Sequence, residues 1–128
     1  MGKLLYFSET NGLGATVRLD SGEPCSVSIS KGIRGSVIVK KSRFGFFGSV
    51  LYKDKFAHFQ ALKTADEINA RFPIDIVQAD IGDPVLRAFT NAILHCSSCR
   101  EIATTLAEVA AVAHKIVLDP SSSREPNL

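Results

Sequence analysis

The sequence predicts an α+β fold, in which an N-terminal antiparallel sheet of five or six strands is packed by about three C-terminal helices. The sheet is expected to be either a small barrel or a curled sheet. In residues 1–56, short apolar runs separated by glycine-containing turns recur about every ten residues. Helical periodicity and N-cap patterns follow in residues 57–118, and residues 119–128 form a polar tail. We therefore expect one compact domain spanning residues 1–118.

The expected strands alternate with turns rich in glycine. Asn11-Gly12 is a strong hairpin signal, because both central residues of a two-residue type I′ turn have positive φ. Between Cys25 and Ser30, apolar and serine side chains alternate strictly, as in a strand with one buried face. The expected strands are Lys3–Ser8, Gly14–Asp20, Cys25–Ser30, Ser36–Lys41 and Phe46–Tyr52.

The first helix is less sharply bounded. Residues 56–63 fit either a sixth strand or the start of a helix. Thr64 and Glu67 have the spacing of a capping box, which predicts a helix starting there. This helix is expected to end at Phe72, because a proline follows and disfavours helical geometry before it. Ile74–Gln78 is then expected to form a short strand.

Two further helices are expected. Asp83 is a candidate N-cap with proline at the next position, and Ser98 and Glu101 form a second capping box. The last helix is rich in alanine, which lets helices approach closely, so it is expected to pack on the sheet or, as a homo-oligomer, on a second copy. The expected apolar stripes are Leu86, Phe89 and Ile93 on one helix, and Ile102, Leu106, Val109, Ala113 and Ile116 on the other.

Charge is distributed unevenly along the chain. The formal net charge is +2, too small for a protein that coats nucleic acid through bulk charge alone. Residues 1–56, however, contain nine Lys or Arg and four Asp or Glu, whereas residues 57–128 contain six and nine. This asymmetry predicts a basic face on the first half of the chain.

Composition also bears on location. The sequence contains no apolar run long enough to cross a bilayer, so no membrane partner is expected. Three cysteines are an odd number, which argues against a secreted disulfide framework. We therefore expect a cytoplasmic protein.

The densest cationic cluster lies beside aromatic residues, in a segment that we call the basic–aromatic stretch (residues 40–53). Cations and flat rings on one solvated face of a sheet are typical of surfaces that bind nucleic acid. Alternatively, the rings belong to the core, the glycines mark a bend, and the cations form a solvated edge. The candidate binding residues are Lys40, Lys41, Arg43, Phe44, Phe46, Phe47 and Lys53.

The segment Phe44-Gly45-Phe46-Phe47 resembles the core of the first ribonucleoprotein motif of RNA-recognition and cold-shock proteins. The resemblance implies a strand whose aromatic rings stack on bases while neighbouring cations contact phosphates. It covers these four residues. Arg43 stands where the motif has glycine and Ser42 where it has a cation, and no second aromatic strand accompanies it.

Cys96 and Cys99 form a Cys-x-x-Cys pair, which suits a redox disulfide or half of a zinc site. The cap at Ser98 places Cys99 at the first helical position, where the helix dipole favours a thiolate. Zinc would need two more ligands, and the remaining histidines and Cys25 do not have ligand spacing. Alternatively, the pair consists of two small thiols packed in a turn between helices.

These patterns predict a non-enzymatic binding module that uses the basic–aromatic face for nucleic acid or for an acidic protein partner. One alternative is a small thiol-redox or metal-binding protein that uses Cys96 and Cys99. Another is a pocket between sheet and helices that binds a small molecule. The sequence shows no set of residues with catalytic spacing, and no cofactor or metal is expected.

Overall fold

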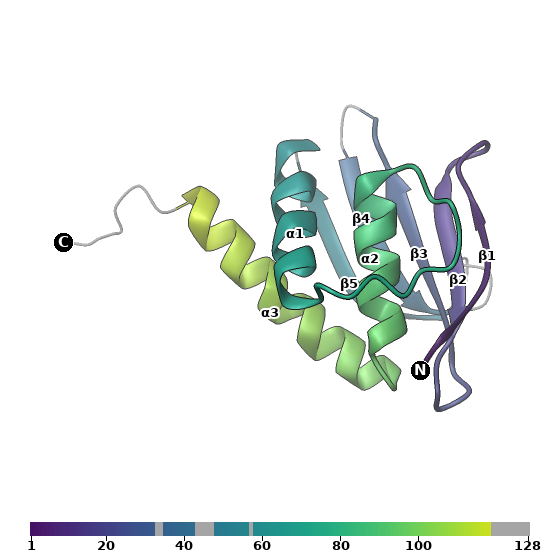
Figure 1. The fold of residues 1–128 in the computed structure, drawn as a ribbon. Coiled ribbons are helices and arrows are strands. Elements are labelled where there is room, and N and C mark those ends of the chain that lie inside the picture. Colours follow the sequence, from purple (N-terminus) through teal and green to yellow (C-terminus); the bar gives the residue numbers. More distant parts are fainter. Residues whose placement is uncertain (33–34, 43–47, 57, 119–128) are drawn as a thin grey trace.

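The computed structural model describes residues 1–32, 35–42, 48–56 and 58–118. These residues form a five-stranded antiparallel sheet followed by three helices, which confirms the α+β prediction (Figure 1). The strand order is β1-β2-β3-β4-β5, so each strand pairs with the next one in sequence. The elements are β1 Lys3–Ser8, β2 Leu13–Arg18, β3 Pro24–Ser30, β4 Gly35–Lys41, β5 Ser49–Phe56, α1 His58–Arg71, α2 Pro84–His95 and α3 Cys99–Leu118.

The sheet is open. β1 and β5 are its two edges and do not pair with each other, so the curled sheet is correct and the closed barrel is not. Within the described residues no sixth strand follows, because β5 continues to Phe56 and α1 starts at His58. The fifth strand therefore begins and ends later in the sequence than the predicted Phe46–Tyr52.

The hairpin between β1 and β2 is confirmed, although its loop is longer than the predicted two-residue turn. The loop comprises residues 9–12, and Ser8 pairs with Gly14. Gly12 has a φ of 119°, a conformation that side chains on L-residues disfavour. Glycine at this position is thus required by the backbone, as the sequence suggested.

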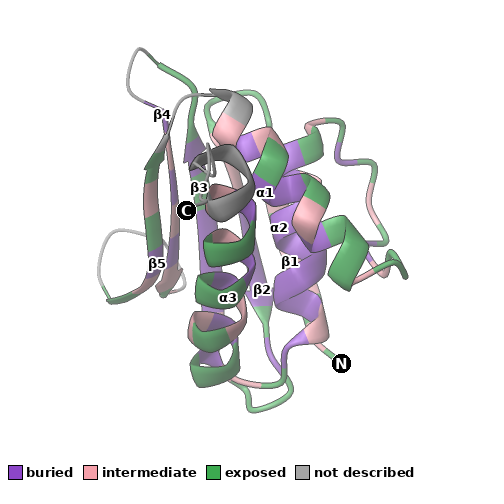
Figure 2. Cartoon of the chain, turned by 90° about the vertical axis from the view of Figure 1, so that its left-hand side faces the viewer, coloured by how far each residue is buried: buried purple, intermediate pink, exposed green. Residues whose placement is uncertain are grey.

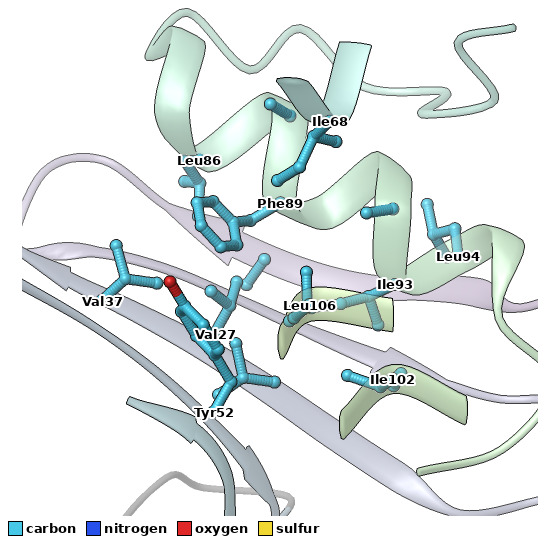
Figure 3. Packing of buried hydrophobic residues seen from close by; sticks show 14 of the residues in the cluster. Val27, Val37, Tyr52, Ile68, Leu86, Phe89, Ile93, Leu94, Ile102 and Leu106 are labelled. Carbon is cyan, nitrogen blue, oxygen red and sulfur yellow. The ribbon is translucent and has the colours of Figure 1, made fainter. Parts of the chain in front are cut away.

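All three helices lie on one face of the sheet, and no described helix lies on the other face (Figure 1). Buried residues are concentrated where the helices meet the sheet (Figure 2). In the core, the rings of Tyr52 and Phe89 lie 5.9 Å apart between sheet and α2 (Figure 3). Fully burying side chains of this size contributes about 1.5–3 kcal/mol each. The largest buried side chains are Phe89, Ile68, Leu86, Ile93, Ile102, Leu106, Val17, Val27, Val37, Val39, Val85 and Val109.

The capping box predicted at Thr64 is wrong. α1 begins at His58, so Thr64 lies in the middle of the helix, where it is buried. Its hydroxyl donates a hydrogen bond to the carbonyl oxygen of Gln60, 2.9 Å away, one turn earlier. A threonine can satisfy its hydroxyl in this way inside a helix, and the capping pattern does not distinguish the two positions. α1 ends at Arg71, one residue before the predicted Phe72.

The caps of the other two helices are confirmed. Oδ1 of Asp83 accepts hydrogen bonds from the amides of Val85 and Leu86, at 3.0 and 2.9 Å. At the start of α3, the hydroxyl of Ser98 accepts a hydrogen bond from the amide of Glu101 at 3.3 Å. The carboxylate of Glu101 accepts from the amide of Ser97 at 2.8 Å, one residue earlier than in a regular capping box. The predicted apolar stripes of α2 and α3 are buried wherever their side chains are described.

The strand predicted at Ile74–Gln78 does not form. This segment runs as an extended loop along α2, and side chains of α2 replace the hydrogen bonds of a ladder. Oδ1 of Asn91 accepts from the amide of Ile76 at 2.8 Å, and its Nδ2 donates to the carbonyl of Ile74 at 3.1 Å. One turn earlier, Arg87 donates to the carbonyl of Ala79 at 2.8 Å. This segment is therefore extended but has no neighbouring strand, because side chains of α2 satisfy its backbone groups.

Candidate functional site

The open face of the sheet carries lysines on β4 and β5. Neighbouring residues in a strand point to opposite faces, and residues paired across a ladder point to the same face. Val39 is in the core, so Lys40 points away from the helices, as does its partner Ser26 on β3. Lys53 and Lys55 pair with residues 38 and 36 of β4, which also alternate with core valines. Lys40 and Lys53, both expected at the binding face, are thus brought together, and Lys55 joins them.

Two more cations lie on this face at the opposite end of the sheet. Lys3 of β1 pairs with Arg18 of β2, next to the buried Val17, and both cations are exposed. None of the outward-pointing positions of the described strands is Asp or Glu. We call these five cations the outer basic set: Lys3, Arg18, Lys40, Lys53 and Lys55.

The outer basic set differs in its pairing from several cations elsewhere in the described chain. Lys31, Arg71 and Arg87 form ion pairs with carboxylates. Among the described residues, no carboxylate lies within ion-pair distance of any member of the outer basic set. No described carboxylate therefore neutralises the positive charge on this face.

Lys41, also expected at the binding face, is separated from Lys40. Its side chain is on the same face of the sheet as the core residue Val39, and its Nζ lies 2.9 Å from Oε2 of Glu23. The hydrogen bond from Lys41 is the main reason that the pKa of Glu23 is lowered to about 2, with further hydrogen bonds from Ser21 and from the amide of Cys99. Lys41 thus helps to join the sheet to the start of α3.

Four of the expected binding residues, Arg43, Phe44, Phe46 and Phe47, lie outside the described residues. Their stacking on bases stays a prediction. The described part of the basic–aromatic stretch resumes at Gly48, and β5 begins at Ser49.

The open face also contains a hollow of about 340 Å³ that the sequence did not suggest. It lies over β1, β2 and β3 at the end near the first hairpin loop, and Tyr6 stands at its side, half-exposed. A regular strand would point Tyr6 inward with Leu4, but an irregularity between these two residues reverses its direction. Alternation in the sequence does not reveal such a reversal. The polar side chains that line the hollow are Tyr6, Ser8, Asn11, Thr16, Ser26 and Ser28.

The thiols are packed in the interior. Cys25, Cys96 and Cys99 are free and buried, with exposed fractions of 0, 3 and 4%. Burial raises the pKa of Cys25 to about 12 and that of Cys96 to about 11. Burial, together with the nearby carboxylate of Glu23, also raises the pKa of Cys99, opposite to the lowering expected from the helix dipole. Protonated, inaccessible thiols are poor nucleophiles, so this geometry favours a packing role.

Two carboxylates near α2 make hydrogen bonds within the chain. Among the described residues, no group of three or more His, Cys, Asp or Glu is arranged to hold a metal ion. Asp83 caps α2, and Asp75 accepts a hydrogen bond from Arg87 at 2.7 Å. These carboxylates therefore stabilise the chain around α2.

A polar contact between β5 and α3 was not predicted. The hydroxyl of Tyr52 donates to Oδ2 of Asp54 at 3.0 Å, and Nε2 of His114 lies 3.0 Å from the same oxygen. That nitrogen is buried and makes no hydrogen bond to any described residue. Burial, and then the neighbouring Asp54, raise the pKa of the Tyr52 hydroxyl. This contact lies at the edge of the helical layer, on the opposite side of the sheet from the outer basic set.

Comparisons with known proteins found no match for this chain. No protein-family model matches it, and neither a curated protein nor a solved structure does. In the part of the chain that the structure describes, no helix has the length and apolarity needed to cross a membrane. The geometry of the open face is therefore the basis for assigning a function.

Proposed function

We propose that this protein is a non-enzymatic binding module whose open sheet face docks single-stranded nucleic acid. The observation that carries the proposal is the outer basic set: five outward-pointing cations, with no carboxylate at an outward-pointing position of the described strands. Phosphate contacts of Lys and Arg release condensed counterions, and this supplies most of the affinity in sequence-independent binding.

The spacing of the cations supports an extended polyanion. Lys53 and Lys55 are alternate residues of one strand, so their Cα atoms lie about 6.7 Å apart. Lys40 lies on the adjoining strand, and neighbouring strands are separated by about 4.8 Å. Lys3 and Arg18 stand on the far strands, so a bound chain can cross the whole sheet while meeting cations at both ends. Hydroxyl groups occupy the middle and can donate hydrogen bonds to phosphate or sugar oxygens.

An acidic protein is the competing partner, and the surface favours it less. Stable protein interfaces are centred on a well-packed apolar or aromatic cluster. On the described part of the open face, Val50 and Tyr6 are the strongly exposed large apolar side chains, and they stand on strands at opposite edges. Between them lie serine, threonine and glycine around the hollow, together with the half-buried Ile38 of β4. This mainly polar lining suits a polar backbone better than an apolar one.

The test is binding of a fluorescein-labelled oligonucleotide of about 12 nucleotides, a length within the site sizes of single-strand-binding folds. Affinity is measured by fluorescence anisotropy between about 50 and 200 mM salt. The double variant Lys53→Ala/Lys55→Ala is compared with Lys63→Ala, which removes an exposed lysine from α1 on the helical side.

We expect the double variant to bind several-fold more weakly and to lower the salt slope by about 1.4, because each phosphate contact on a single strand contributes about 0.7. Lys63→Ala should behave as the wild type. Absence of binding at low salt would overturn the proposal. Poly-glutamate that competes as effectively as an unlabelled oligonucleotide would also overturn the proposal, because that result would assign the open face to acidic protein partners.

A further inference from the structure

We propose that the hollow beside Tyr6 is a subsite for one nucleobase, which stacks on the Tyr6 ring while its strand runs across the outer basic set. This inference rests on the proposed function and adds a specific contact to it. It concerns residues outside the basic–aromatic stretch, which the sequence did not connect with binding.

The hollow exists because the strands beneath it carry small side chains. Gly14 lies at its floor and pairs with Ser8 on one side and Ser28 on the other. A Cβ atom at Gly14 would come within 3.3 Å of the carbonyl oxygen of Val27, so the backbones are already close there. A volume of about 340 Å³ is at the lower end of the range for small-ligand sites, which is suitable for a single planar ring system.

Tyr6 supplies the flat surface. Tyr6 is 51% exposed, although an aromatic ring gains more by burial. The irregularity between Leu4 and Tyr6 turns this ring out of the core and over the edge of the hollow. Irregularities of this kind often re-aim a side chain next to a functional site. Stacking uses the face of the ring and does not require the hydroxyl group.

Polar groups around the hollow match the edges of a base. The amide of Asn11 offers both donors and an acceptor, and the hydroxyl of Ser28 offers one donor and two acceptor lone pairs. Thr16 and Ser26 line the inner part of the hollow. Donors and acceptors together allow hydrogen bonds with any base, so the subsite is suited to stacking with limited sequence preference.

The hollow is placed for a strand that also meets the cations. Ser26, which lines it, is the direct partner of Lys40 on β4. Lys40 is thus one strand spacing, about 4.8 Å, from the wall of the hollow. Lys53 and Lys55 lie one strand further out. A nucleotide whose phosphate contacts Lys40 can therefore extend its base toward Tyr6.

The composition of the chain provides a direct probe. The protein has no tryptophan and two tyrosines, so its intrinsic fluorescence comes from Tyr6 and the buried Tyr52. Stacking of a base on Tyr6 should quench the exposed fluorophore. Titration with unlabelled oligo-dT and oligo-rU measures the quenching, and anisotropy with labelled oligonucleotide measures the affinity independently.

We expect wild-type fluorescence to fall on binding, and Tyr6→Phe to abolish the quenching while affinity stays within about twofold, because the phenyl ring still stacks. Tyr6→Ala should weaken binding about 5- to 150-fold, the range for loss of one stacked base. Ser28→Leu is the second variant, since it fills the hollow from an exposed position and leaves Tyr6 in place. It should weaken binding as well.

The controls separate this inference from the proposed function. An abasic oligonucleotide retains the phosphates, so its affinity should be insensitive to Tyr6→Ala. Oligonucleotide binding that depends on Lys53 and Lys55 but is unchanged in Tyr6→Ala and Ser28→Leu would overturn the subsite and leave the proposed function standing. Free thymidine monophosphate that binds as tightly as the oligonucleotide would also overturn it, because the hollow would then serve a free nucleotide. If the wild-type protein does not bind oligonucleotides at all, both the subsite and the proposed function are wrong.

Discussion

Asn91 is expected to be a major determinant of stability, because one side chain holds the extended segment that follows α1. The residue is 3% exposed. Its Oδ1 accepts from the amide of Ile76, and its Nδ2 donates to the carbonyls of Ile74 and Phe72, at 3.1 and 3.4 Å. Asn91→Ala removes all three hydrogen bonds and leaves partly buried backbone groups without a partner.

The magnitude follows from these contacts. Each hydrogen bond contributes about 0.5–1.5 kcal/mol net, and a buried group left unsatisfied costs about 1–3 kcal/mol. Water can reach part of the segment, because Ile74 is largely exposed. We therefore expect Asn91→Ala to lower the free energy of unfolding by about 3 kcal/mol. For a chain of this length, that loss lowers the melting temperature by about 10 °C.

The assay is urea unfolding followed by circular dichroism, with Thr90→Val as the matched control. Thr90 is equally buried on the same helix, but its hydroxyl donates only to the carbonyl of Leu86 in its own helix, at 2.6 Å. Its replacement should cost less than about 1 kcal/mol. Equal losses in the two variants would refute the reasoning, since they would show that Asn91 contributes through packing and not through the backbone of the segment.

Three further predictions concern ionisable groups. The folded state keeps Glu23 ionised far below its ordinary pKa of 4.5, so wild-type stability should fall as pH drops from 4.5 to about 2, and Glu23→Gln should lose less in urea unfolding across that window. Native thiols should resist alkylation at pH 8, because burial raises the pKa of Cys25 and Cys96; rapid stoichiometric labelling without denaturant would contradict this. Tyr52→Phe removes the donor to Asp54 and should lower the free energy of unfolding by about 1 kcal/mol, whereas an unchanged urea midpoint would argue against that contact.

Elements specified by their own residues could be predicted from the sequence. The alternation of serine and apolar residues in β3 depends only on the period of a strand, and it gave the buried face correctly. The cap at Asp83 is likewise local, because its carboxylate reaches amides two and three residues ahead. Such signals are complete within a few residues and need no knowledge of tertiary contacts.

Elements determined by distant contacts were not predictable. Thr64 lies inside α1 because the helix begins earlier and packs Ala61 and Ala65 into the core, which a capping pattern does not register. Ile76 is satisfied by a side chain from another helix, so its segment has the composition of a strand without a sheet. In both cases a contact with a distant part of the chain determined the structure, and the local sequence pattern did not.

The candidate site was predictable in part. Strand period places Lys40 on one face and Lys41 on the other, and the pairing of β4 with β5 places Lys53 opposite Ile38, on the same face as Lys40. Tyr6 could not be assigned in the same way, because its direction depends on an irregularity in β1. The cations at the far end of the sheet also required the register, which brings Lys3 opposite Arg18.

The sign of the charge on the open face indicates whether these charged residues serve binding or only solubility. An uncovered sheet must avoid stacking and edge pairing, and charged side chains prevent both. Either sign serves that purpose, and acidic residues improve solubility more than basic ones. Yet the described outward positions are cationic or neutral throughout, while Asp54, the acidic residue within the described strands, points toward α3. Protection of the sheet alone does not explain why carboxylates are excluded from the described outward positions. A polyanionic partner explains it, because each carboxylate on this face would repel that partner.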